Sequence, residues 1–194
     1  MGIDPTQGFP TTPAGRVADK LGEVERRLSA LERGAQFLGT FANNGTYLRF
    51  ANVPQDYRHL RVVWVAQSQR SGFANTGGRV NANGGSYSIW YFTPGAAGGT
   101  GSGQSSWYVG QIPAGSRGND DQAALVVMEF PFYSSTNLRK HMTFRSSGGD
   151  GTNLVGGFGG GERYTDSAAI TLIDLGDDVG ATLGPRSRAE LWAW

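Results

Sequence analysis

The sequence contains no cysteine and only two histidines among its 194 residues. Without cysteine, neither a disulfide nor a thiolate metal site can form, so packing or association must stabilise the fold. No apolar run approaches the roughly 20 residues that a membrane helix needs. Residues 1–15 also lack the basic and apolar regions of a signal peptide, so we expect a soluble, unprocessed product with no membrane partner.

An excess of charge of one sign is also lacking, because 17 basic residues face 16 acidic ones and the formal net charge is +1. A balanced chain has no bulk field that attracts nucleic acid, so no nucleic-acid partner is expected. Charged residues make up only 17% of the chain, whereas 31 residues are glycine, about twice the average usage. This composition favours an all-β domain with many turns.

Groups suited to catalysis are scarce. His59 and His141 both fall in or at the start of predicted strands, and neither has the spacing of a metal-ligand pair. The adjacent acids at residues 120–121 and 177–178 lie in turn sequences, which is typical of solvated loop charge. Catalysis needs a base beside a nucleophile or metal, so we expect a non-enzymatic protein without metal or cofactor.

The N-terminal part has two segments of different character. Residues 1–15 contain three prolines, which remove backbone donors and predict an extended arm. From residue 16 the apolar residues alternate at spacings of four and three, the pattern of a coiled-coil seam. The seam of this helix, predicted over residues 16–35, comprises Val17, Leu21, Val24, Leu28, Leu31 and Ala35.

The residues that flank this seam are complementary in charge. Lys20 is followed five positions later by Glu25, and Arg27 by Glu32, so each pair could meet between chains of a parallel bundle. So short a helix is marginal alone in water and needs a partner. Packing against the β domain of the same chain is one possibility. Valine at the d positions disfavours a dimer, and we predict a parallel homotrimer.

The remainder, residues 36–194, reads as a series of short strands separated by turn signals. An Asn-Gly pair at residues 44–45 predicts a hairpin. Leu60, Val62, Trp64 and Ala66 alternate along one face of a predicted strand. Two glycine-rich stretches, residues 94–103 and 148–162, are interpreted as long exposed loops. Strands are predicted within residues 35–41, 46–53, 59–68, 86–93, 105–112, 123–133, 140–146, 168–176 and 187–194.

These features predict a mainly β fold, a jelly-roll-like antiparallel β-sandwich preceded by a short N-terminal trimeric coiled-coil helix. Aromatic residues gather in two of the strands, at Trp90, Tyr91 and Phe92 and at Trp107 and Tyr108. One face of each strand would fill the core. The outward members of the set Trp90, Phe92, Trp107 and Tyr108 would pack between subunits or form a stacking platform for cell-wall sugars.

The order of elements in the β part resembles a domain of structural proteins in tailed bacteriophages. The matching features are "FANVPQDYRHLRVVWVAQS", "SYSIWYF" within a glycine-rich middle, and "AAITLIDLGD" before the terminal "LGPRSRAELWAW". The last strand departs from the usual ending in that it closes on Trp192 and Trp194. The segment "RLSALE" likewise resembles a known trimerisation motif, carried here by Arg27, Leu28, Leu31 and Glu32.

The resemblance implies a non-enzymatic homotrimeric virion component, made in the host cytoplasm and located on the tail or capsid surface. A minor tail or tail-tip protein is expected, with the N-terminal arm anchored to other virion proteins and the β domains displayed for assembly or host contact. A capsid decoration protein at threefold positions is the first alternative. A carbohydrate-binding receptor module that contacts a host cell-surface glycan is the second.

Overall fold

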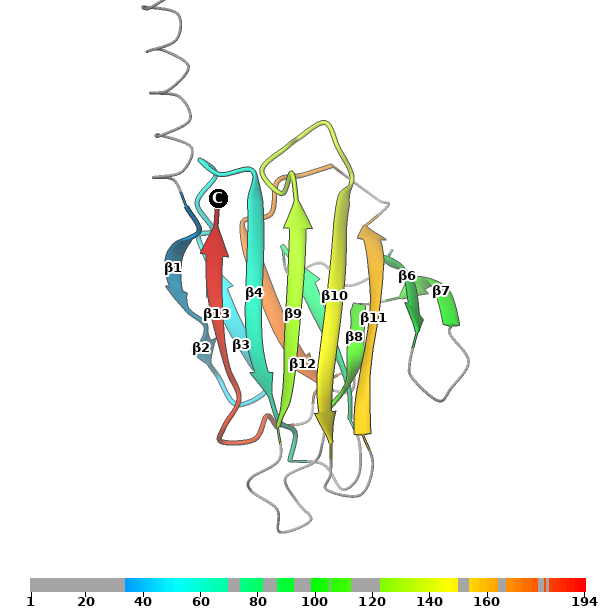
Figure 1. Cartoon of the computed structure of the whole chain (residues 1–194). Coiled ribbons are helices and arrows are strands. Elements are labelled where there is room, and N and C mark those ends of the chain that lie inside the picture. The colour runs from blue at the N-terminus through cyan, green and yellow to red at the C-terminus, as the bar shows by residue number, and fades with distance from the viewer. Residues whose placement is uncertain are drawn as a thin grey trace, which may run out of the picture. The chain divides into compact units, whose positions relative to one another are not determined.

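The computed structural model shows a domain built from two β-sheets (Figure 1). The chain divides into a unit that ends at Gln36 and a second unit from Phe37 to Trp194. The predicted arm and the predicted helix up to residue 33 lie outside the described residues, so the coiled coil, its seam up to Leu31 and its ion pairs stay predictions. The predicted end of the helix was wrong, because Gly34 and Ala35 are described and are not helical. The structure describes residues 34–69, 74–81, 87–92, 99–104, 106–112, 123–149, 154–163, 167–177, 180 and 182–194.

The described residues form thirteen strands and no helix, and every described register is antiparallel. This confirms the prediction of a mainly β fold with antiparallel sheets. No helix in this part of the chain could span a membrane. The strands are β1 (Gln36–Thr40), β2 (Ala42–Asn43), β3 (Tyr47–Ala51), β4 (His59–Ala66), β5 (Ala74–Val80), β6 (Tyr87–Phe92), β7 (Gly99–Gln104), β8 (Trp107–Ile112), β9 (Ala124–Pro131), β10 (Lys140–Gly149), β11 (Leu154–Arg163), β12 (Leu172–Asp177) and β13 (Arg188–Ala193).

The larger sheet has eight strands in the order β1-β13-β4-β9-β10-β11-β6-β7, and the smaller has five in the order β2-β3-β12-β5-β8. In Figure 1 the strands from β13 to β11 face the viewer, and β3, β12 and β8 lie behind them. The two sheets form a sandwich-like arrangement with the apolar core between them.

The core follows from alternation along the central strands. Leu60, Val62 and Trp64 of β4 are fully buried, as the sequence predicts, while the residues between them are exposed or half-buried. Strand β9 pairs with β4 and alternates in the same way, with Val126 and Met128 buried. Because side chains of a strand point to opposite faces in turn, each strand offers one row to the core and one row to its outer face.

The glycine-rich stretches are not simply loops, and the prediction was wrong for much of them. Residues 99–104 form β7, and residues 148–149 and 154–163 belong to β10 and β11. Strands β10 and β11 pair over ten residues each. A Cβ at Gly161 would lie 2.4 Å from Cδ1 of Trp107, and one at Gly159 would lie 2.6 Å from Cε1 of Phe144. Glycine is needed in β11 because large aromatic side chains of the core lie against its backbone.

Two acidic residues of β12 are buried and partnered. Asp174 accepts two hydrogen bonds from the Arg49 guanidinium, at 2.7 and 2.8 Å. The hydrogen bond and the charge of Asp174 raise the pKa of Arg49 above its ordinary value. Asp177 is also buried, and the Ser68 hydroxyl donates to it at 3.2 Å. The prediction that Asp177 is solvated loop charge was therefore wrong, because the strand continues one residue beyond the expected turn.

The turn after β9 is held by two buried side chains. The Tyr133 hydroxyl donates to the carbonyl of Pro54, and the Lys140 ammonium donates to the carbonyl of Leu138 at 2.7 Å and to that of Ser135. Both side chains are fully buried. The Lys140 bonds close the turn on itself, and the Tyr133 bond ties it to the segment before β4.

Replacing Tyr133 by phenylalanine is expected to cost about 1 kcal/mol of stability at neutral pH, the ordinary value of one lost hydrogen bond. Burial raises the pKa of Tyr133 to about 12, whereas an unfolded tyrosine titrates near ~10. Above pH ~10 the unfolded state ionises first, so the native stability contributed by this group is lost as the pH rises toward 12. Urea unfolding of both proteins should show the difference between them shrinking at high pH, and a constant difference would contradict this account.

Candidate functional site

The two histidines lie on different strands of the large sheet, β4 and β10, with β9 between them. His59 begins β4, where its ring stacks on Trp194 at 5.6 Å and meets Phe132 at 5.3 Å. His141 lies on β10 and is exposed, consistent with the predicted strand position. Within the described ranges, no group of three or more His, Asp or Glu side chains is arranged to hold a metal ion.

The clearest candidate site is a groove of about 970 Å³ on the outer face of the large sheet. We call it the sheet groove. It crosses the neighbouring strands β4, β9, β10, β11 and β6, so its residues come from widely separated parts of the chain. It is lined by Arg61, Trp90, Val127, Glu129, Thr143, Phe144, Arg145, Ser146, Gly157, Phe158 and Gly159.

Strand register places the outward residues of the sheet groove in two parallel rows. In the first row Val127 of β9 is opposite Arg145 of β10, which is opposite Phe158 of β11, which is opposite Phe92 of β6. Neighbouring strands lie roughly 4.8 Å apart, so the row forms a continuous line of side chains across the sheet. It runs from an aliphatic residue through a cation to two aromatic rings.

The second row runs beside the first, and its position in β11 is a glycine, which has no side chain. Glu129 is opposite both Arg61 and Thr143, Thr143 is opposite Gly160, and Gly160 is opposite Trp90. A Cβ at Gly160 would lie 3.0 Å from Nε1 of Trp90. The indole therefore lies over this glycine, and it occupies space that any larger residue would take.

Three aromatic rings form a cluster at one end of the sheet groove. Phe158 lies 5.4 Å from Phe92 and 6.5 Å from Trp90, measured between ring centroids. The exposed fractions are 49% for Trp90, 46% for Phe92 and 49% for Phe158. Each ring packs on its neighbours and still leaves about half of its surface to solvent, which is uncommon for residues of this size.

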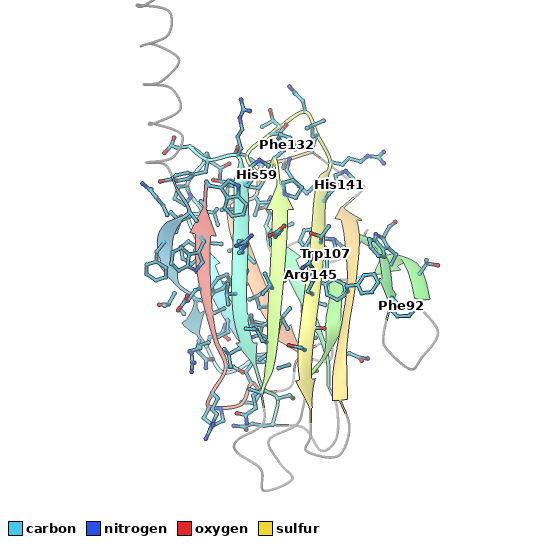
Figure 2. All side chains as sticks on the ribbon, viewed as in Figure 1. His59, Phe92, Trp107, Phe132, His141 and Arg145 are labelled. Atoms are coloured by element: carbon cyan, nitrogen blue, oxygen red, sulfur yellow. The ribbon has the colours of Figure 1, made fainter. Side chains whose placement is uncertain are left out.

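The charged groups of the sheet groove are unequally partnered. Arg61 donates two hydrogen bonds to Oε1 of Glu129, at 3.1 and 2.6 Å, and its guanidinium also lies 5.1 Å from the Trp194 ring. Arg145 is exposed and makes no ion pair with another described residue. In Figure 2, Arg145 lies over β10 and Phe92 lies toward the end of the sheet formed by β6 and β7. The described lining thus has one unpaired positive charge beside the aromatic cluster.

The predicted aromatic residues take different positions. Trp90 and Phe92 lie on the outer face, at the sheet groove and beside it. Trp107 is fully buried between Tyr87 and Phe130 and is a core residue. Tyr108 has no described side chain. Arg145 and Phe158 were not predicted as site residues. Phe158 is the single bulky residue within "GGFGGG" and would indicate an outward position if that stretch were interpreted as a strand.

The sheet groove can bind a ligand through ring stacking and a guanidinium, and its described residues include no base placed beside a nucleophile. A binding function therefore suits it better than catalysis. No family model, curated protein or solved structure matches this chain.

Proposed function

We propose that this chain is a non-enzymatic structural component of a bacteriophage virion, a homotrimer at the tail or tail tip that displays its β domain for assembly or host contact. The main observation in favour of this proposal is the strand order of the two sheets. Residues 16–33 would form the coiled coil that joins three chains, and residues 1–15 would anchor the trimer to other virion proteins.

The strand order supports a jelly roll. Four pairs of strands are nested along the chain, with β1 beside β13, β3 beside β12, β4 beside β9 and β5 beside β8. Successive pairs belong to alternate sheets, which is what results when one long hairpin is rolled into a two-sheet sandwich. Jelly rolls recur in viral capsid and lectin domains. A fold alone does not establish a function, so the position of the chain in a virion must be tested.

The additional strands separate this domain from a minimal jelly roll. Strands β6 and β7 are inserted between β5 and β8, and β10 and β11 between β9 and β12. All four extend the larger sheet beyond β9. Three of them, β6, β10 and β11, supply most of the lining of the sheet groove. The strands added to the basic sandwich therefore also form most of the candidate binding surface. Such an arrangement suits a display domain.

Antibody labelling of purified virions tests the proposal. An antibody raised against residues 36–194 is expected to label the tail or tail tip in electron micrographs. Label on the capsid at threefold positions would instead support the alternative, a decoration protein. If the chain is abundant in the lysate but absent from purified particles by mass spectrometry, the virion proposal is wrong.

A second candidate function, a carbohydrate-binding receptor module, is favoured by one observation. The three half-exposed rings pack on one another on the outer face of the large sheet, at the sheet groove and beside it, and each leaves about half of its surface to solvent. This function is compatible with a virion position, because a tail protein that contacts the host needs a surface that recognises it.

A further inference from the structure

We propose that the sheet groove binds an acidic oligosaccharide, with sugar rings stacked on Trp90 and Phe158 and an anionic substituent paired with Arg145. The proposal deepens the proposed function by naming the class of host molecule, and it rests on that function only for the source of the sugar. The binding itself can be tested on the isolated protein.

The aromatic cluster provides the stacking surface. An aromatic ring carries negative charge on its face, so it attracts the weakly positive C–H groups that a sugar ring presents on one side. The rings of Phe158 and Phe92 are inclined to each other by only 33°, while those of Phe158 and Trp90 meet edge to face at 78°. The cluster therefore offers ring faces in two directions, as a bent chain of sugars requires.

Arg145 provides the charge recognition. It stands directly opposite Phe158 in the register of β10 and β11, so a sugar stacked on that ring would have its substituents one strand spacing, roughly 4.8 Å, from the arginine backbone. A guanidinium binds a carboxylate or phosphate through two parallel hydrogen bonds. Arg61 already forms hydrogen bonds with Glu129. Arg145 is the other cation of the described lining, and no described acidic side chain pairs with it.

The remaining lining suits the hydroxyl groups of a sugar. Thr143 is exposed in the second row, next to the Arg61–Glu129 pair. Together these side chains offer hydrogen-bond donors and acceptors across from the rings. The arrangement joins an apolar stacking surface to a polar side, and a carbohydrate has the same two kinds of surface.

Other ligand classes fit the sheet groove less well. A nucleic acid binds through several phosphate contacts, whereas the described lining carries one positive charge in excess. A protein partner of ordinary size would need a well-packed apolar centre. Among the described lining residues Val127 is the single aliphatic side chain. The half-exposed rings, together with the Arg145 guanidinium that no other described residue pairs with, favour the oligosaccharide.

Calorimetry on the full chain with matched probes tests the proposal. The probes are a hexasaccharide rich in uronic acid, the same hexasaccharide with its carboxylates reduced to alcohols, a phosphorylated hexasaccharide and a single-stranded oligonucleotide. An acidic saccharide is expected to bind about tenfold more tightly than its neutral counterpart, which is the effect of one charge-assisted pair. The uronic and phosphorylated probes show which anion is preferred. Equal binding of the reduced probe, or tightest binding of the oligonucleotide, would overturn the proposal.

Two pairs of variants locate the binding. Arg145→Gln should abolish the preference for the acidic probe, while Arg188→Gln, which removes an exposed charge from β13, should leave it unchanged. Trp90→Ala should weaken every saccharide about tenfold, whereas Phe37→Ala, at another half-exposed ring, should have no effect. Circular dichroism confirms that each variant is folded.

The two proposals can fail separately. If the chain binds saccharides but is absent from virions, the virion proposal alone fails. If it is present in virions but binds no saccharide, the inference of an acidic oligosaccharide ligand alone fails.

Discussion

Replacing Trp107 with alanine is expected to lower the free energy of unfolding of the β domain by about 3–5 kcal/mol, the cost of truncating a fully buried aromatic residue. Trp107 begins β8 of the small sheet and has no exposed surface. Its ring lies 4.9 Å from that of Tyr87 and 5.3 Å from that of Phe130, both in the large sheet. It thus joins the two layers, and its loss would leave a cavity against Gly161 that the rigid sheets cannot fill.

Urea unfolding followed by circular dichroism measures this effect, and the chain contains its own matched control. Trp90→Ala makes the same change on the outer face, where the indole is 49% exposed, and should cost less than about 1 kcal/mol. Typical domains have a free energy of unfolding of about 5–15 kcal/mol. The Trp90 variant should keep most of this stability, whereas the Trp107 variant should lose a large part of it. Equal losses for the two variants would show that Trp107 does not hold the sheets together.

If the chain is the proposed trimer, substituting aspartate for both Leu28 and Leu31 is expected to convert it to a monomer, a threefold fall in mass by light scattering. Burying one leucine side chain stabilises an assembly by about 1.5–3 kcal/mol. In the predicted bundle the same leucines are buried in each of the three chains. Two carboxylates per chain would meet at the centre of the bundle, where ionised groups cannot be desolvated without partners. The circular dichroism of the β domain should not change.

The control places the same charges outside the seam. Ser29→Asp with Ala30→Asp adds two acids at neighbouring positions of the predicted helix that face solvent, so the trimer should persist. A seam variant that remains threefold in mass would show that the β domain alone holds the assembly. An unmodified chain that is already monomeric would contradict the trimer itself, and with it the display function proposed above.

Much of the sandwich could be predicted because its central strands alternate. Strand β4 has an unbroken alternation of buried apolar residues with more exposed ones, and β9 and β13 repeat it. The hairpin at Asn44 and Gly45 was also correctly placed, since Gly45 has a φ of 92° and the Asn44 side chain accepts the amide of Tyr47 at 2.8 Å. These are local signals, in which the residues that form an element are the residues that specify it.

Strands β5, β7 and β11 were missed for a physical reason. Each contains glycine where a strand pattern would have a side chain, so no alternation can be detected. In β11 the backbone is shaped by its neighbours, because Phe144 and Trp107 occupy the space where a Cβ would be. The information that makes this segment a strand lies in residues of β8 and β10, and the glycine-rich sequence by itself contains none of it.

The sequence by itself determined that the domain is mainly β, which side of its central strands is apolar, and that the chain lacks the residues of a thiolate site. Only the tertiary structure decided that Arg145, Phe158 and Trp90 line one groove. It also decided that Trp107 lies in the core instead. The reason is that alternation specifies two faces of a strand but not which strands become neighbours. Pairing between distant segments sets the register, and the register places Arg145, which forms no ion pair with another described residue, beside three half-exposed rings.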